Sequence, residues 1–115
     1  MSDEQTVAAL KALAHETRWR MIEFLLSQSL CVGALAQTLG ITEAATSQHL
    51  QILRRAGLVR GEKRGYWTHY LVQIQELERL GRRLAELPER AADFKDLNTE
   101  MCAGPNQANS KTGGS

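Results

Sequence analysis

Apolar positions in the first quarter of the chain recur at helical spacing and predict two helices. Val7, Leu10 and Ala14 fall at i, i+3 and i+7, so they share one side of a first helix. A second helix is expected over residues 16–27, because its apolar positions continue the same period. Those positions are Trp19, Ile22, Leu25 and Leu26.

Capping residues mark the limits of two more helices. Ser29 is expected to cap a short third helix, and Gly40 ends it because glycine tolerates the positive φ common at helix C-termini. Thr42 is expected to cap a fourth helix over residues 43–55, which Gly57 stops. The inward positions of these two helices are Val32, Leu35, Ala36, Leu39, Thr46, Leu50 and Leu53.

After the fourth helix the spacing changes to a pattern typical of strands. Residues 58–61 and 66–71 contain aromatic and β-branched side chains, and a segment that ends in Gly65 separates them. A two-stranded hairpin with its turn in residues 62–65 is therefore expected. An isolated hairpin is marginally stable in water, so this one must pack on the helices. The predicted fold class is mainly α with a small β-hairpin wing, an α+β arrangement.

Leucines at spacings of three, four and three follow the hairpin and predict a last long helix, which Pro88 ends or kinks. A weaker apolar pattern then favours one more short helix, and the polar composition from Gly104 onward predicts a disordered tail. We therefore expect one domain over residues 1–103 and a tail over residues 104–115. The leucines are Leu77, Leu80, Leu84 and Leu87, and the later apolar positions are Ala91, Phe94, Leu97 and Met101.

Composition narrows the class of protein without naming a partner. The 115 residues suit a single small domain, and 43% apolar residues are enough for a packed core. The net charge of +1 decides nothing about nucleic acid, but five of the six charged residues from Arg54 to Arg64 are positive. The sequence shows no signal-peptide pattern and no apolar run of membrane-spanning length. A cytoplasmic protein without a membrane partner is expected.

The third and fourth helices have helix-turn-helix spacing. Small polar side chains on the outward face of the fourth helix let its backbone approach the floor of the DNA major groove and pair with base edges. The helix N-terminus at Thr42 is suited to a phosphate group. The hairpin would flank the duplex, with Lys63 and Arg64 at its tip on phosphate or in the minor groove. The outward positions are Ala44, Ser47, Gln48 and Gln51.

These segments resemble the ArsR/SmtB family of winged-helix repressors over roughly residues 7–87. The resemblance implies a homodimer formed by the first and last helices, with packing inside one chain as the alternative for both apolar stripes. A twofold dimer presents two recognition helices to double-stranded DNA, so the operator is expected to be an imperfect palindrome. The matching segments are residues 10–18, 30–36, 40–42, 47–50, 53–59 and 65–70. The implied interface residues are Val7, Leu10, Leu77, Leu80, Leu84 and Leu87.

The same interpretation assigns roles to individual DNA-binding residues. Ser47, Gln48 and Gln51 are expected to contact bases, beside the small Ala44. Glu43 departs from this pattern, because an acid at the front of the helix repels phosphate, although it can accept a hydrogen bond from a cytosine amino group. The residues expected to hold mainly the DNA backbone are Thr42, His49, Lys63 and Arg64.

Two cysteines are candidates for sensing. The family resemblance suggests a Cys-Val-Cys metal site at the start of the third helix, often followed by an acidic residue. Here Cys31 supplies the first cysteine, but Gly33 stands at the second cysteine position and Ala34 at the acidic position, so half of that site is missing. We expect Cys31 in the first helical turn, where the helix dipole stabilises a thiolate. Together with Cys102 it suits As(III) or another soft metal ion, with disulfide or persulfide sensing close behind. A small buried apolar role is the alternative for Cys31.

No pattern of residues indicates an enzyme or an organic cofactor. The sequence has no phosphate-binding glycine loop and no recognisable catalytic triad or carboxylate pair. His15, His49 and His69 lack metal-ligand spacing, and the leucine series contains neither His nor Asp, so a zinc site of the kind the family carries on its last helix is not expected. The predicted function is a DNA-binding repressor released when its thiols bind arsenite or a thiophilic metal. A redox-sensing repressor and a winged-helix protein-interaction module are the alternatives.

Overall fold

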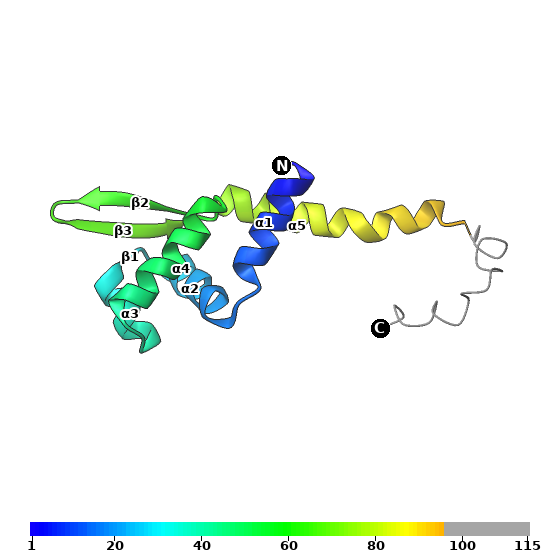
Figure 1. Ribbon diagram of the computed structural model, residues 1–115. Coiled ribbons are helices and arrows are strands. Elements are labelled where there is room, and N and C mark those ends of the chain that lie inside the picture. Colours follow the sequence, from blue (N-terminus) through cyan, green and yellow to red (C-terminus); the bar gives the residue numbers. More distant parts are fainter. Residues whose placement is uncertain (96–115) are drawn as a thin grey trace, which may run out of the picture. The chain divides into compact units, whose positions relative to one another are not determined.

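The computed structural model describes residues 1–95, with Asp93 described for its backbone alone. The chain divides into two compact units, Met1–Ala85 and the residues from Glu86 onward. The predicted positions Leu97, Met101 and Cys102 and the predicted tail over residues 104–115 lie outside the described residues. In chain order (Figure 1) the elements are α1 (Asp3–Leu13), α2 (Glu16–Ser27), β1 (Leu30–Cys31), α3 (Val32–Leu39), α4 (Glu43–Arg55), β2 (Val59–Arg64), β3 (Trp67–Val72), α5 (Ile74–Glu89) and the 3₁₀ turn η1 (Arg90–Asp93).

A glycine cap sets the end of α3 and a side-chain cap sets the start of α4, both as predicted. The Thr42 hydroxyl accepts a hydrogen bond from the backbone N–H of Ala45 at 3.1 Å, so α4 begins at Glu43. Gly40 ends α3 with a φ of 71° in the left-handed region. At the start of α2, Nδ1 of His15 accepts from the backbone N–H of Thr17 at 3.1 Å.

The sheet has three strands in the order β1-β3-β2, one more than predicted. The residues Leu30 and Cys31 pair with Tyr70 and His69 of the central strand β3. Ser29 therefore does not cap α3: Cys31 occupies the N-cap position, and its side chain makes no capping hydrogen bond. A strand of two residues has no measurable period, so only the pairing with β3 reveals it.

The hairpin is longer than predicted and turns later. Arg64 pairs with Trp67, so Gly65 and Tyr66 form the turn, whereas residues 62–65 were the expected turn. Gly65 adopts a φ of 66°, which favours glycine at the first position of a two-residue turn. Consequently Lys63 and Arg64 lie on β2 rather than in the turn. The hairpin projects beyond α3 and α4 (Figure 1).

The hydrophobic core joins the helices to the base of the hairpin. Thr46, Leu50 and Leu53 form the inner face of α4 as predicted, each exposed by 2% or less. The buried hydroxyl of Thr46 donates to the backbone oxygen of Thr42 at 2.8 Å, which satisfies the one polar group on that face. The other core residues are Ala9, Ala12, Met21, Ile22, Leu25, Leu35, Leu39, Leu58, Val59, Val72 and Leu80.

The apolar face of α1 is rotated from the prediction, and that of α2 is confirmed in part. On α1 the buried residues are Thr6, Ala9 and Ala12, while Val7 is 49% exposed. Small side chains bring α1 close to its neighbours, so the face was hard to recognise from hydrophobicity. On α2 the predicted Ile22 and Leu25 are buried, together with Met21, which was not predicted. The other two predicted residues, Trp19 (56%) and Leu26 (48%), are exposed.

The leucine series of α5 does not form one continuous surface. Leu80 is 2% exposed and belongs to the chain's own core, which Leu77 also contacts, so packing within the chain accounts for this part. Leu84 (43%) and Leu87 (59%) are exposed. The guanidinium of Arg83 forms an ion pair with Asp3, which ties α5 to the start of α1.

Pro88 was predicted to end or kink the last helix; it lies inside α5, which continues to Glu89 before η1, so it does not end the helix. The short helix predicted from Ala91 onward is, in its described part, the 3₁₀ turn η1. Within residues 1–95, every helix is too short or too polar to cross a membrane.

Candidate nucleic-acid interface and thiol site

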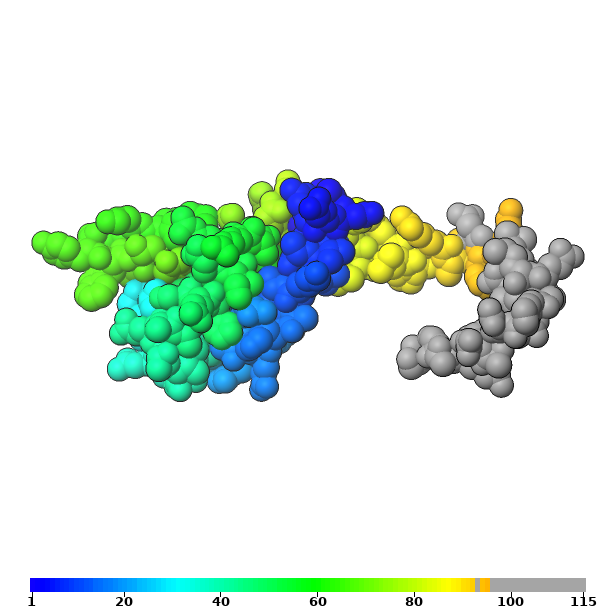
Figure 2. All heavy atoms as spheres, in the orientation of Figure 1, coloured from blue at the N-terminus to red at the C-terminus, as the bar shows by residue number. Residues whose placement is uncertain are grey.

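The outward face of α4 is polar, shallow and accessible. All four predicted outward residues are exposed, opposite the buried Thr46, Leu50 and Leu53. Because none of the four is larger than glutamine, a flat surface such as the floor of a groove in duplex DNA can approach the helix backbone closely. Figure 2 shows α4 on the visible surface of the molecule. The four residues are Ala44, Ser47, Gln48 and Gln51.

The first turn of α4 has both a cap and an acid. Thr42 is exposed, and its hydroxyl accepts a hydrogen bond from the backbone N–H of Ala45. The other backbone N–H groups of the first turn can therefore donate to an anion. The Glu43 carboxylate leans toward α3: a Cβ atom placed on Gly33 would lie 3.7 Å from its Oε2. This position beside the first turn of α3 keeps the negative charge near a positive helix end.

His49 connects α4 to the junction of α1 and α2. Its Nδ1 accepts a hydrogen bond from the Arg18 guanidinium at 3.2 Å, and its ring centroid lies 4.8 Å from that of His15. Arg18 also donates to the backbone oxygen of Ala12 at 2.6 Å. Burial, then the positive charges of His15 and Arg18, lower the pKa of His49. The lowered pKa favours the neutral form of His49. Its contacts with Arg18 and His15 hold α4 against the junction of α1 and α2.

The wing, defined here as the β2–β3 hairpin, carries its positive charges in two different states. Arg64 donates to Glu62 at 3.2 Å and to the Ser29 hydroxyl at 3.0 Å, while Arg60 forms an ion pair with Glu62 at 2.7 Å. Hydrogen bonds from Arg60 and Arg64 lower the pKa of the Glu62 carboxyl. Lys63 is exposed, and its ammonium group forms no hydrogen bond or ion pair within residues 1–95. Of the two predicted phosphate contacts on the wing, Lys63 and Arg64, only Lys63 has a charge that is not shared with a carboxylate.

Two aromatic residues at the tip of the wing were missed by the sequence interpretation. Tyr66 is 99% exposed and Trp67 is 65% exposed. The available signal was an aromatic pair directly after the turn glycine, but it was assigned to a strand face. The tip is therefore apolar, with the cationic residues behind it on β2.

The thiol of Cys31 lies where three elements meet. Cys31 is half-buried, ends β1, and occupies the N-cap of α3, which packs on α4. Its strand partner His69 is also the partner of Glu62, so the three residues form one row across the sheet. Nδ1 of His69 is buried and unpaired within residues 1–95. In the same part of the chain, no three His, Cys, Asp or Glu side chains are grouped closely enough to hold a metal ion.

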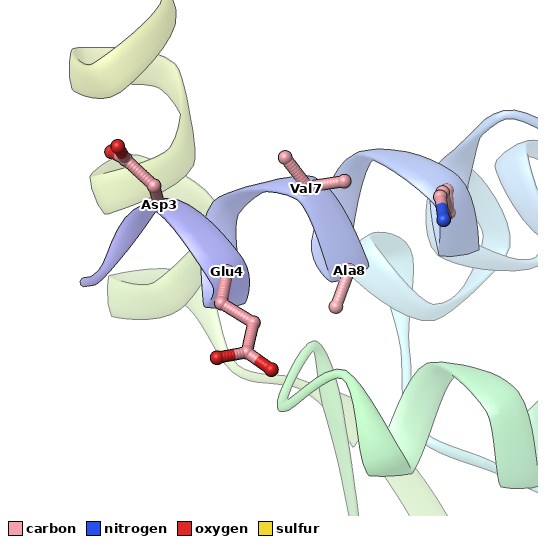
Figure 3. Close-up of a pocket in the computed structure, with 5 residues that line it drawn as sticks. Asp3, Glu4, Val7 and Ala8 are labelled. Carbon is pink, nitrogen blue, oxygen red and sulfur yellow. The ribbon is translucent and has the colours of Figure 1, made fainter.

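The exposed side of α1 is the other accessible apolar surface. Asp3, Glu4, Val7, Ala8 and Lys11 line an open hollow there, shown in Figure 3. Val7 and Ala8 are its apolar lining residues, and the other three are charged. Of the two predicted interface residues on this helix, Val7 is exposed here, whereas Leu10 is half-buried against the core.

Comparison with known proteins identifies a family with this arrangement. A family model described as bacterial regulatory protein, arsR family, matches residues 15–60, from the cap of α2 into β2. The transcriptional activator HlyU of Vibrio cholerae is 38% identical over 74 residues, which cover 64% of this chain and 68% of HlyU. The chain belongs to the ArsR family of bacterial regulatory proteins.

Further relatives show how much of the ArsR-family chain is shared. The arsenical resistance operon repressor of Escherichia coli is 39% identical over 66 residues, which cover 56% of each chain, so the match spans little more than half of that repressor. A solved ArsR-like regulator from Rhodococcus sp. RHA1 superimposes with a TM-score of 0.70 at 30% identity and covers 78% of this chain and 89% of its own. Reduced HlyU from Vibrio cholerae gives a TM-score of 0.58 at 36% identity, covering 70% and 88%.

The family fixes the general class of activity. This ArsR-family chain is a DNA-binding transcriptional regulator with a winged helix-turn-helix fold, and it is not an enzyme. The predicted fold class is confirmed, with the third strand β1 as an addition. The names of its relatives include both an activator and a repressor, so membership of the family leaves the direction of regulation open.

Proposed function

We propose that this ArsR-family regulator acts in the cytoplasm as a homodimeric repressor that binds an imperfect palindromic operator and leaves it when its thiols are ligated. The observation that carries the proposal is the outward face of α4, which is small, polar and exposed while its opposite face is buried. Ser47, Gln48 and Gln51 read base edges in the major groove. Thr42 at the helix N-terminus and Lys63 on the wing hold phosphates.

Two predicted DNA contacts act differently in this proposal. His49, on α4, is hydrogen-bonded to Arg18 of α2, so it positions the recognition helix α4 rather than touching phosphate. Arg64 is bonded to Ser29 and Glu62, so it stiffens the wing and lends little net charge to the DNA backbone. Glu43 beside Gly33 leaves the helix end open to phosphate.

The exposed apolar side of α1 supports a symmetric dimer. Val7 is 49% exposed and stands beside Ala8 in the open hollow of α1, and Leu84 on α5 is 43% exposed. A second copy would remove these side chains from water, which stabilises association in proportion to the apolar area covered. Three other predicted interface residues support this surface from the core, in which they pack: Leu10, Leu77 and Leu80. Leu87, the remaining predicted interface residue, is 59% exposed.

Cys31 is placed to convert ligation into loss of DNA binding. It joins β1, which pairs with the wing, to α3, which packs on α4, so a ligand on its sulfur displaces both DNA-contacting elements. Arsenite or another thiophilic metal ion is the inducer we favour, with Cys102 as a second thiolate. Relatives named as arsenical resistance operon repressors support this choice.

A thiol redox switch is the second candidate, and one finding favours it. A structural neighbour at 36% identity is reduced HlyU from Vibrio cholerae. In this chain Cys31 and Cys102 would supply a disulfide or persulfide, and no organic cofactor is needed.

One titration tests the proposal. Purified protein is bound to DNA from its own promoter, and arsenite, Zn(II), Cu(I), a disulfide-forming oxidant and a persulfide donor are added in turn. Arsenite is expected to release the wild type and to leave both the Cys31→Ser and the Cys102→Ser variants bound, because each lacks one of the two proposed thiolates. Release of both variants at wild-type concentrations would contradict thiol sensing. Absence of operator binding by the untreated protein would contradict repression itself.

A further inference from the structure

An open hollow between α1 and α4, here called the α1–α4 hollow, is lined by cations and apolar side chains, and no carboxylate of residues 1–95 lines it. Its volume of about 380 Å³ lies within the ~300–1,000 Å³ typical of small-molecule sites. Ala8 and Lys11 also line the hollow on the exposed side of α1, whereas the other five residues do not, so the two linings are largely separate. The cations are Lys11, Arg18 and Arg55, and the apolar residues are Ala8, Ala12, Ile52 and Ala56.

Two of these cations have no partner in the described part of the chain. Lys11 lies in the last turn of α1 and Arg55 in the last turn of α4, and both are exposed. Neither side chain forms a hydrogen bond or an ion pair within residues 1–95. A concave surface lined by charges of one sign concentrates ligands of the opposite sign. The α1–α4 hollow is therefore suited to an anion.

The third cation, Arg18, is held in place by contacts with two helices. It is the third residue of α2, where the helix dipole disfavours a positive charge, so other interactions must position it. Its Nε donates to the backbone oxygen of Ala12 on α1 at 2.6 Å, and its Nη1 donates to Nδ1 of His49 on α4 at 3.2 Å. The Nη2 group has no partner within residues 1–95, so it remains available to a ligand in the hollow.

The apolar part of the lining narrows the class of anion. Ile52 is 39% exposed, and three alanines extend this surface. Inorganic phosphate would satisfy the cations and leave the apolar surface in water, whereas a neutral apolar molecule would leave the cations unpaired. A guanidinium group matches a carboxylate through two parallel hydrogen bonds. A carboxylate with a short apolar group satisfies both parts of the lining.

We propose that the α1–α4 hollow binds a small carboxylate that carries a short apolar group, and that this ligand weakens operator binding. Arg55 follows Gln51 by one helical turn, so it lies on the side of α4 that is proposed to face DNA. A carboxylate on Arg55 neutralises a positive charge beside the duplex, and on Arg18 it engages the residue that holds His49. The regulatory part rests on the proposed DNA binding through α4, and it needs neither thiol.

NMR titrations of the isotope-labelled full chain test the site, with hexanoate and benzoate as probes. Arg55→Gln and Lys11→Gln each remove one cation without breaking a side-chain hydrogen bond or ion pair within residues 1–95. The matched control is Arg54→Gln, which makes the same change at the preceding, exposed position of α4, outside the hollow. Because the hollow is open, Arg55→Gln is expected to raise the dissociation constant of both acids about 10-fold, the lower end of the range for a hydrogen bond to a charged group. Arg54→Gln should leave it unchanged.

Two further probes separate charge from apolar contact. Inorganic phosphate supplies the charge alone and hexanol the apolar chain alone, so both should bind more weakly than hexanoate. Equal binding of phosphate and hexanoate would overturn the apolar part of the proposal. Equal affinities of the wild type and Arg55→Gln for hexanoate would overturn the site, as would the absence of amide shifts with both acids.

Operator binding tests the regulatory part. At constant ionic strength, saturating hexanoate should weaken operator affinity about 5- to 150-fold, measured by fluorescence anisotropy. Cys31→Ser should respond like the wild type, because the hollow does not use the thiol. Unchanged operator affinity with hexanoate bound would overturn this part. A protein that binds no operator without ligand would contradict the proposed function alone, since the NMR titration involves no DNA. A smaller salt dependence of operator binding in Lys11→Gln, with no binding of either acid, would assign these cations to DNA phosphate and overturn the ligand site.

Discussion

Replacing Lys63 by glutamine removes one positive charge from the wing without breaking a side-chain hydrogen bond or ion pair within residues 1–95. Each phosphate that a cation neutralises adds about 0.9 to the slope of log affinity against log salt concentration. A dimer with two wings on DNA should therefore lose about 1.8 from its slope. Between about 50 and 200 mM salt, the wild type should lose about 12-fold more affinity than the variant, since a fourfold change in salt is raised to the power 1.8.

The measurement is fluorescence anisotropy of a labelled operator at four or more salt concentrations. Lys95→Gln is the matched control, because it makes the same change at an exposed position outside the wing and should leave the slope unchanged. Arg64→Gln should change the slope less than Lys63→Gln, because Glu62 already shares the charge of Arg64. A loss of about 0.9 would mean that a single wing touches DNA. An unchanged slope for Lys63→Gln would refute the assignment of Lys63 to phosphate.

Three further predictions concern the sensor, the recognition helix and pH. Gly33→Cys restores a Cys-Val-Cys pair with Cys31, and the new Cβ has room, because the nearest atom, Oε2 of Glu43, lies at 3.7 Å. Chelation by two thiolates should raise the affinity for arsenite about 100-fold. An unchanged arsenite titration would contradict this. Thr42→Ala removes the cap of α4 and should lower the free energy of unfolding by about 1 kcal/mol in urea titrations, with Thr42→Ser near wild type. The pKa of His49 is lowered in the folded state, so the unfolded chain binds more protons and stability should fall as the pH drops from about 6.5 through the folded pKa. His49→Gln should lose that part of the pH dependence; an identical pH profile would exclude His49 as its source.

The thiol site shows how pairing between distant strands changes a local prediction. From the sequence, Ser29 before an apolar helical pattern indicated a cap, which put Cys31 in the first helical turn. In the fold, Ser29 instead accepts a hydrogen bond from Arg64, 35 residues later, and Cys31 ends a strand paired with β3. The interaction that decides the position of the thiol is therefore absent from the local sequence.

The exposed side of α1 shows a related effect on a helix. Val7 and Leu10 belonged to the predicted stripe, yet the buried positions are Ala9 and Ala12 with Thr6. Close approach of two helices favours small side chains, and hydrophobic periodicity underweights them. The larger Val7 is consequently exposed, and Leu10 is only half-buried.

The sequence by itself determined the helix-turn-helix. Thr42 and Gly40 set the ends of α4 and α3 by local backbone chemistry, and the helical period selected Leu50 and Leu53 as the inner face. Only the tertiary structure decided that Lys63 stays unpaired while Arg64 does not. It also decided that Tyr66 forms the tip of the wing and that Cys31 faces a strand from the other half of the chain. Those outcomes depend on strand register and on contacts between residues far apart in sequence, which local propensity does not encode.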